Sequence, residues 1–184
     1  MANSWFKKEK PLLGMMGSGG GLAQGSAAED TGHVASGGII SDYTSGSDKY
    51  RAHIFTTSGS FVISELSNAF PATADYFLVG GGGGGGGGHP TSSVGAGGGG
   101  GGGAIEGASL SVTAQTYNIV VGTGGQGECW TGDDTFFAGY NGNDSSISTP
   151  TVGIVTAYGG GGGAQRTPAP GAANARSGGA GGGS

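Results

Sequence analysis

The sequence predicts a mostly β protein with few or no helices, in which short β-hairpins accompany a packed bundle of polyglycine II helices behind an extended N-terminal arm. Three observations lead to this fold class. Glycine supplies 48 of the 184 residues, against a usual share of about 7%. The longest glycine runs directly follow or precede short stretches rich in β-branched and aromatic residues. No segment has the apolar spacing of an amphipathic helix.

The first 48 residues divide into an arm and a linker. Residues 1–25 contain large apolar side chains with too few apolar neighbours to form a core, so we expect the arm to insert into a partner. These docking residues are Trp5, Phe6, Leu12, Leu13, Met15 and Met16. A terminus that docks nowhere is the alternative. Residues 26–48 are small and polar, which predicts a linker.

The domain expected over residues 49–184 begins with strand patterns. YRAHIFTTSGSFVIS predicts a β-hairpin with Ile54, Phe61 and Ile63 facing inward. ADYFLV (74–79) predicts a strand that runs straight into nine glycines. ASLSVTAQTYNIVVG predicts a second hairpin, and TVGIVTAY (151–158) predicts a strand that leads into another glycine run.

The glycine runs are either flexible tether or ordered scaffold. An ordered glycine costs about 0.5–1 kcal/mol more than alanine in conformational entropy, so one isolated glycine strand is unstable. Several together are different, because extended chains without Cβ atoms can approach closely and hydrogen-bond to one another in a three-residue helix. The runs lie between apolar strands rather than between separable domains, which favours scaffold. The predicted scaffold positions are Gly80, Gly84, Gly88, Gly97, Gly100, Gly103, Gly159 and Gly163.

Composition argues against several functions. The formal net charge is -5, and the few Lys and Arg residues are scattered, so we expect no nucleic-acid partner. No stretch is long and apolar enough to span a bilayer, and no signal peptide is expected. One cysteine, Cys129, excludes an internal disulfide framework. The glycine runs match no phosphate-binding loop. We expect no enzyme activity, no cofactor and no metal site.

Polar excursions interrupt the glycine runs and supply the candidate contact residues. The most promising excursion spans 128–148, where aromatic rings stand among carboxylates and amides, as they do in many contact surfaces. The alternative is that these rings form a small side core. The excursions at 89–93 and 166–170 are secondary candidates that could be simple turns. The receptor-contact candidates are Trp130, Asp133, Asp134, Phe136, Phe137, Tyr140, Asn141 and His89.

The order of these features resembles the glycine-rich domain of tail-fibre and adhesin proteins of tailed bacteriophages. The resemblance covers about residues 50–184 and rests on YRAHIFTTSGSFVIS, ADYFLVGGGGGGGGG, SLSVTAQTYNIVVGTGGQG, NGNDSSIS and IVTAYGGGGGA. It implies a virion protein whose polyglycine II helices stack and present loops to a cell-surface receptor. The arm FKKEKPLLGMMGSGGG is also similar to N-termini of structural proteins from phages of marine cyanobacteria.

We therefore expect a tail-fibre or fibre-tip protein, assembled in the host cytoplasm and located in the virion. Its expected partners are tail-fibre, baseplate or capsid proteins through the arm, and a host surface protein or glycan through the loops. A homo-oligomer, with a trimer as the first candidate, is expected because the arm cannot fold alone. The alternative is a purely architectural subunit that decorates the capsid or attaches a fibre and binds no receptor. An ice-binding protein would need a flat, regular ladder that these irregular interruptions do not provide.

Overall fold

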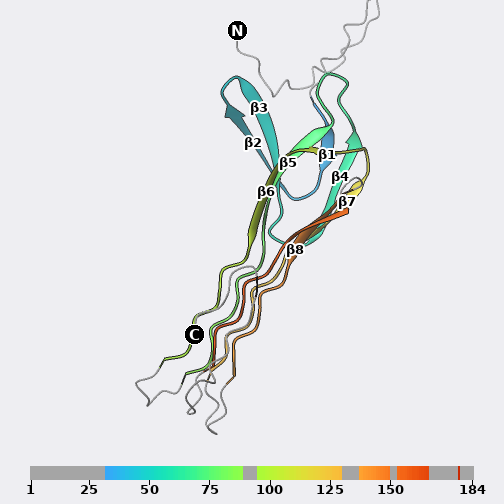
Figure 1. The fold of residues 1–184 in the computed structure, drawn as a ribbon. Coiled ribbons are helices and arrows are strands. Elements are labelled where there is room, and N and C mark those ends of the chain that lie inside the picture. The colour runs from blue at the N-terminus through green and yellow to red at the C-terminus, as the bar shows by residue number, and fades with distance from the viewer. Residues whose placement is uncertain (1–31, 89–94, 130–136, 150–152, 166–177, 179–184) are drawn as a thin grey trace, which may run out of the picture.

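The computed structural model describes residues 32–88, 95–129, 137–149, 153–165 and 178, and these residues form strands and extended segments without a helix. The chain is thus mostly β, as the sequence predicts. The strands are β1 (Val34–Ser36), β2 (Ile39–Ser45), β3 (Asp48–Ile54), β4 (Gly59–Glu65), β5 (Thr73–Val79), β6 (Ala104–Ser111), β7 (Thr116–Val120), β8 (Ser145–Thr149) and β9 (Gly153–Ala157), of which Figure 1 labels all but β9.

The strands form three antiparallel sheets, none of which closes into a barrel. Five strands pair in the order β1-β4-β7-β8-β9, while β2 pairs with β3 and β5 pairs with β6. A small core lies where the five-stranded sheet meets the β5–β6 sheet. Ile63, Val112 and Tyr117 are buried there, surrounded by the partly buried Ala35, Phe61, Leu66, Ala74, Ile119 and Ile147. The fully buried Tyr117 hydroxyl accepts a hydrogen bond from the Thr113 N–H and donates one to the Thr113 carbonyl.

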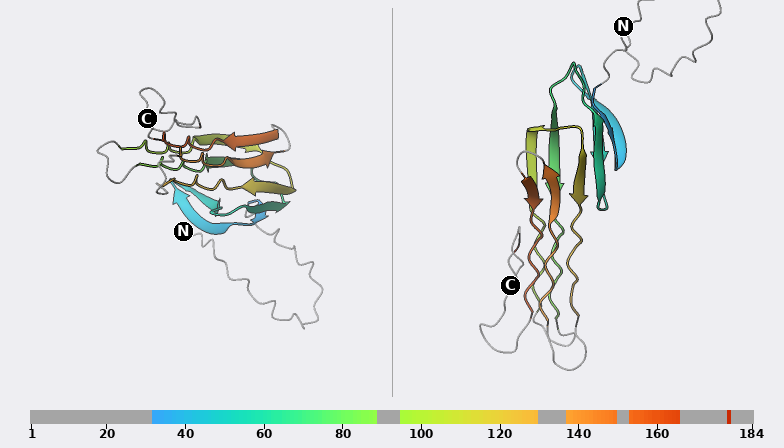
Figure 2. Two further views of the ribbon diagram at one scale, coloured as in Figure 1. Left: turned by 90° about the horizontal axis from the view of Figure 1, so that it is seen from below. Right: turned by 90° about the vertical axis from the view of Figure 1, so that its right-hand side faces the viewer.

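Each of five strands continues into a glycine-rich segment, and these segments run side by side away from the sheets (Figures 1 and 2). β5, β7 and β9 lead into segments 1, 3 and 5, whereas segments 2 and 4 lead back into β6 and β8. The segments are defined as segment 1 (80–88), segment 2 (95–103), segment 3 (122–129), segment 4 (137–144) and segment 5 (159–165).

Both predicted hairpins are wrong in their pairing, although their strands exist. β3 pairs with β2 rather than with β4, and β4 lies between β1 and β7. Likewise β6 pairs with β5, and β7 pairs with β4 and β8. The alternating residues that predict each strand report which face is buried, and they carry no information about the partner strand. Ile54, expected to face inward, is 46% exposed on the β2–β3 sheet.

Three strands occupy residues that composition assigns elsewhere. β1 and β2 lie within residues 26–48, so the described part of the predicted linker is ordered β structure. β8 lies at the end of the polar excursion 128–148, where serines dominate. Ser145 and Thr149 are buried in β8 because their hydroxyls bond to backbone carbonyls at Val79 and Gly153. Polar strands of this kind lack the apolar alternation that sequence reasoning uses.

Candidate functional site

Segment 1 hydrogen-bonds to all four other segments with a repeat of three residues. Its N–H groups at Gly80, Gly83 and Gly86 donate to segment 2, at the carbonyls of Gly103, Gly100 and Gly97, over 2.8–2.9 Å. The following residues, Gly81, Gly84 and Gly87, donate to segment 4, at Asn143, Tyr140 and Phe137. The carbonyls of Gly82 and Gly85 accept from segment 3, and those of Gly81 and Gly84 accept from segment 5. Successive residues therefore point to different neighbours, unlike the two-residue alternation of a strand.

These bonds also join the two layers of the molecule. Segments 1 and 2 continue the β5–β6 sheet, and segments 3, 4 and 5 continue the five-stranded sheet. Between the sheets, side chains hold layers roughly 10 Å apart. Between the segments, backbone hydrogen bonds connect the layers directly, as in Gly160 N–H to the Gly81 carbonyl at 2.7 Å. Glycine is what permits this change of spacing, because no Cβ stands between the chains.

Most inner glycine positions have no room for a side chain. A Cβ at Gly83 or Gly86 would collide with the backbone of segment 5, one at Gly80 with the backbone of Tyr158 just before that segment, and one at Gly81 or Gly84 with segment 3. The third set of positions is open. A Cβ at Gly82 would lie 3.7 Å from the nearest atom, the Gly100 carbonyl oxygen, in ordinary contact. From Gly80 to Gly86 of segment 1, the requirement for glycine therefore repeats every three residues and falls on two positions out of three.

The motif NGNDSS (141–146) fastens segment 4 to its neighbours with side chains. The Asn141 and Asp144 Oδ1 atoms accept from the N–H groups of Gly162 and Gly159, at 2.9 and 2.8 Å. Asn143 donates to the Thr123 hydroxyl at 2.7 Å. The Ser145 hydroxyl donates to the Val79 carbonyl and accepts from the Gly122 N–H. Along segment 5, the side-chain oxygens of Asn141 and Asp144 thus accept hydrogen bonds from backbone N–H groups, as backbone carbonyls do elsewhere in the bundle.

Segments 3 and 4 carry exposed side chains at the same three-residue interval. Thr123, Gln126 and Cys129 are exposed along segment 3. Phe137 and Tyr140 are 45% and 49% exposed along segment 4. The two rows adjoin, since the Tyr140 and Asn143 N–H groups donate to the carbonyls of Gln126 and Thr123. Together they form a mixed aromatic and polar surface on one flank of the bundle, which we call the segment 3–4 face.

The ends of the segments meet at the end of the bundle away from the sheets (Figure 2). Gly86 bonds to Gly97, Gly87 bonds to Phe137, and the Glu128 N–H donates to the Gly85 carbonyl, all at or below 3.0 Å. The Gly97 N–H donates to Ala164 of segment 5. Residues 88, 95, 129, 137 and 165, which flank the three polar excursions, therefore belong to one distal end.

In a comparison with known protein families, residues 56–184 match the family described as the glycine-rich domain. The chain belongs to this family. The match covers more than two thirds of the chain, from the loop before β4 to the last residue. Searches of curated proteins and of solved structures gave no match.

Only some of the predicted contact residues of this glycine-rich domain lie in the described part. Phe137 is exposed at the distal end and Tyr140 is exposed midway along the bundle, level with Gly84, whereas the Asn141 side chain bonds to Gly162. Outside the described residues lie Trp5, Phe6, Leu12, Leu13, Met15, Met16, His89, Trp130, Asp133, Asp134 and Phe136.

The predicted scaffold glycines all lie within the segments. Gly88 is at the distal end of segment 1, beside Ala96. Gly103 donates its N–H to the Tyr158 carbonyl, just before segment 5, and the other six donate theirs to a neighbouring segment: Gly80, Gly84, Gly97, Gly100, Gly159 and Gly163.

The described residues of the glycine-rich domain hold no cluster of three or more His, Cys, Asp and Glu side chains that could bind a metal. They also include no helix long and apolar enough to cross a membrane. The exposed Cys129 is a free thiol.

The sequence does contain a signal for segments 3 and 4, which carry NGNDSS and the segment 3–4 face. A search for long glycine runs misses it. In GTGGQGEC (122–129), the residues with side chains at 123, 126 and 129 recur every third position. In FAGYNGND (137–144), Gly139 and Gly142 show the same interval. Both glycines fill places where a Cβ would collide with segment 1. A three-residue period without a long glycine run therefore marks a segment of this bundle.

The three-residue rule predicts opposite outcomes for two neighbouring alanine substitutions. Gly83→Ala places a methyl group against the Gly161 backbone, and we expect a loss of about 1–3 kcal/mol in the free energy of unfolding. Gly82→Ala meets no such obstacle and reduces the entropy of the unfolded chain, so we expect no loss and a gain of up to about 1 kcal/mol. Urea unfolding followed by circular dichroism measures both. Equal effects of the two substitutions would contradict the rule.

Asp144 offers a test of the side-chain fastening. Asp144→Ala leaves the buried Gly159 N–H without its acceptor, which we expect to cost about 1–3 kcal/mol. Asp144→Asn keeps an oxygen at the same place and removes only the charge, so its unfolding midpoint should stay near that of the unmodified protein. If the asparagine variant were as unstable as the alanine variant, the hydrogen bond would not be the source of the stability.

Proposed function

We propose that this chain is a virion structural protein, a tail-fibre or fibre-tip component, that holds loops toward the surface of a host cell. Its segments 1–5 are, in this proposal, polyglycine II helices. The support is the three-residue repeat of hydrogen bonds, which is the period of a polyproline II-type helix. Nine residues in this conformation span about 28 Å, so segment 1 acts as a rigid stalk between the sheets and the distal end.

The observation that carries the proposal is the common position of the segment ends. The chain leaves the bundle at its distal end three times: between segments 1 and 2, between segments 3 and 4, and after segment 5. A stalk that returns the chain to one end three times is suited to presenting variable loops on a fixed support. Exposed Phe137 at this end, with exposed Tyr140 one three-residue repeat further along segment 4, provides the large, rigid contact area that recognition surfaces use. The partner on this side is a host surface protein or glycan.

On the other side, we propose that the N-terminal arm attaches the protein to a tail-fibre, baseplate or capsid protein, in a homo-oligomeric assembly. No step of this function requires catalysis, a cofactor or a metal. The protein reaches its place in the virion from the host cytoplasm, where particles assemble.

A purely architectural subunit is the second candidate, and the β2–β3 sheet favours it. Both strands are exposed for most of their length, with Ile39, Ile40 and Tyr43 at least half exposed. A lone two-stranded sheet is at best marginally stable in water. Its apolar side chains therefore suit contact with another protein of the particle.

The two proposed functions predict different adsorption of particles to host cells when aromatic residues of the proposed contact surface are replaced. Mass spectrometry of purified particles first establishes whether the chain is present, and its absence would reject both proposals. For particles carrying Trp130→Ala and Tyr140→Ala, we expect adsorption to host cells to fall about tenfold or more, as for loss of central aromatic contacts. Particles with Tyr158→Ala, which changes an exposed ring beside the sheets, are the control. Normal adsorption of the particles with Trp130→Ala and Tyr140→Ala would favour the architectural subunit.

A further inference from the structure

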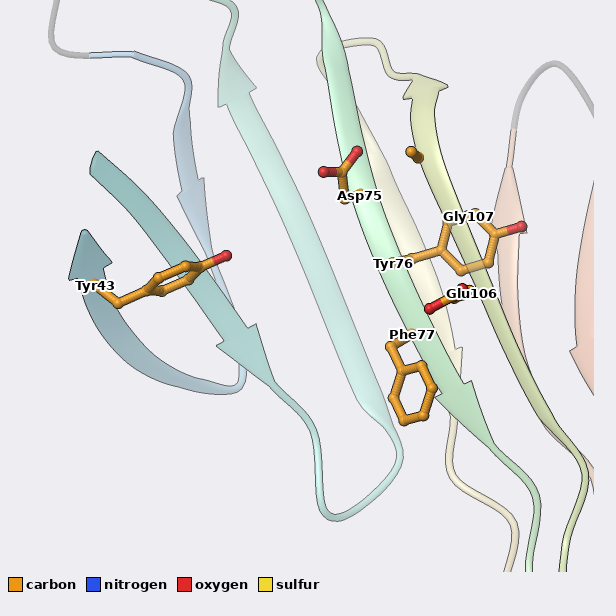
Figure 3. Close-up of a pocket in the computed structure, with 7 residues that line it drawn as sticks. Tyr43, Asp75, Tyr76, Phe77, Glu106 and Gly107 are labelled. Carbon is orange, nitrogen blue, oxygen red and sulfur yellow. The ribbon is translucent and has the colours of Figure 1, made fainter. Parts of the chain in front are cut away.

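A shallow hollow lies between the β2–β3 sheet and the β5–β6 sheet, at the opposite end from the proposed contact loops. It has a volume of about 640 Å³, within the range of sites that hold small ligands or a few side chains. Its lining combines aromatic and acidic side chains: Tyr43, Asp75, Tyr76, Phe77 and Glu106, with backbone from Gly107 and Ala108 (Figure 3). We call it the β2–β5 groove.

The rings of the groove are held in place while remaining open to solvent. Tyr43 on β2 stacks on Tyr50 of β3, with ring centroids 5.3 Å apart. Tyr76 lies over Gly107 on the neighbouring strand, where a Cβ would collide with its ring. Phe77 is 67% exposed, among the highest values for the large apolar residues of the described part. An exposed phenylalanine beside a fixed tyrosine offers apolar contact to an incoming segment.

The carboxylates of the groove have no cationic partner in the described part of the chain. Asp75 accepts a hydrogen bond from the Ser109 N–H at 2.8 Å through one oxygen. No ion pair involves Asp75 or Glu106 among the described residues, whereas Asp42 on β2 pairs with Arg51 at 2.8 Å. The Arg51 guanidinium, by its hydrogen bonds, holds the pKa of the Asp42 carboxyl below its usual range. The groove thus joins apolar rings to negative charge that nothing described neutralises.

One segment of this chain has the complementary chemistry. Three of the chain's seven Lys and Arg residues fall within four positions, at Lys7, Lys8 and Lys10, and with Glu9 between them this stretch keeps an excess of positive charge. Trp5 and Phe6 precede them, and Leu12 and Leu13 follow. Lysines next to aromatic rings fit a surface that alternates rings with carboxylates, since each ammonium can approach a carboxylate or a ring face.

The reach of the chain is sufficient. The described part begins at Gly32, and His33 fixes this start: its Nδ1 accepts from the Ser67 N–H and its Nε2 donates to the Pro71 carbonyl, both at 2.9 Å. β2, which carries Tyr43, begins six residues after His33. The 22 residues from Lys10 to Gly32 can extend over roughly 70 Å. The arm can therefore reach the groove of its own chain or that of a neighbouring copy.

We propose that the β2–β5 groove binds residues Trp5–Lys10 of the N-terminal arm. Trp5 and Phe6 pack against Tyr43 and Phe77, and the lysines face Asp75 and Glu106. This binding does not depend on a role in a virion. Binding in the groove also keeps the apolar side chains of the arm out of water before assembly. Docking of the arm onto another virion protein would then compete with the groove, because both contacts use the same residues.

Fluorescence of Trp5 in the full-length protein tests this directly. The chain has two tryptophans, so Trp130→Phe leaves Trp5 as the only one. We expect its emission to lie at shorter wavelength than that of a synthetic peptide of residues 1–25. In the same background, Asp75→Asn with Glu106→Gln should shift the emission to the wavelength of the peptide. Asp75→Asn keeps an oxygen for the Ser109 N–H, so the sheet remains intact.

Matched variants separate the groove from general effects. Asp48→Asn with Glu65→Gln removes two exposed carboxylates elsewhere and should leave Trp5 emission unchanged. Phe77→Ala should shift it to longer wavelength, and Tyr158→Ala should not. If the Trp5 emission wavelength does not change with protein concentration, the arm lies in the groove of its own chain. If it returns to that of the free peptide on dilution, the arm lies in the groove of a neighbouring copy. Peptide-like Trp5 emission in the Trp130→Phe protein, or no shift in the Asp75/Glu106 variant, would overturn the proposal.

Discussion

Direct hydrogen bonding between two backbone layers is the interaction on which the rest of this molecule depends. In the sheet region, Ile63, Val112 and Tyr117 fill the space between the layers, as in any small β core. After Val79 the chain continues as glycine, and the two layers come close enough for N–H groups of one layer to donate to carbonyls of the other. Because glycines such as Gly80, Gly81, Gly83 and Gly84 face a neighbouring backbone, one methyl group at such a position forces chains apart. The bundle is therefore stiff although its residues are the most flexible kind.

The strands and the glycine segments stabilise each other where they join. Ordering a glycine run is unfavourable on its own, but here every run is tethered at one end to a paired strand. β5 and β6 hold segments 1 and 2 in register, and β7, β8 and β9 hold the other three. Ser145 joins the layers at the point of change, with its hydroxyl between the Val79 carbonyl and the Gly122 N–H. The strands thus set the alignment that the glycine segments propagate to the distal end.

The sequence predicts the elements of this fold better than their arrangement. β5 and β9 are recognisable because apolar, β-branched residues precede glycine. β8 is not, because its buried serine and threonine hydroxyls are satisfied by backbone partners that only the folded state provides. β4 pairs with β1 and β7, which are distant in the chain, and β3 pairs with β2 in residues whose composition predicts a linker; alternation reports neither partner. For the candidate site, exposed aromatics could be named in advance, whereas the bond of Asn141 to Gly162 required the position of segment 5.

The measurement that tests this account most directly is amide hydrogen exchange resolved by residue along segment 1. We predict slow exchange at Gly80, Gly81, Gly83, Gly84, Gly86 and Gly87, whose N–H groups donate to neighbouring segments. Gly82 and Gly85 should exchange fast, because within the described residues their N–H groups donate to no backbone carbonyl. Slow exchange would then follow a period of three. A period of two would indicate ordinary β-sheet, and uniformly fast exchange would show that the segment is tether, either of which contradicts the account.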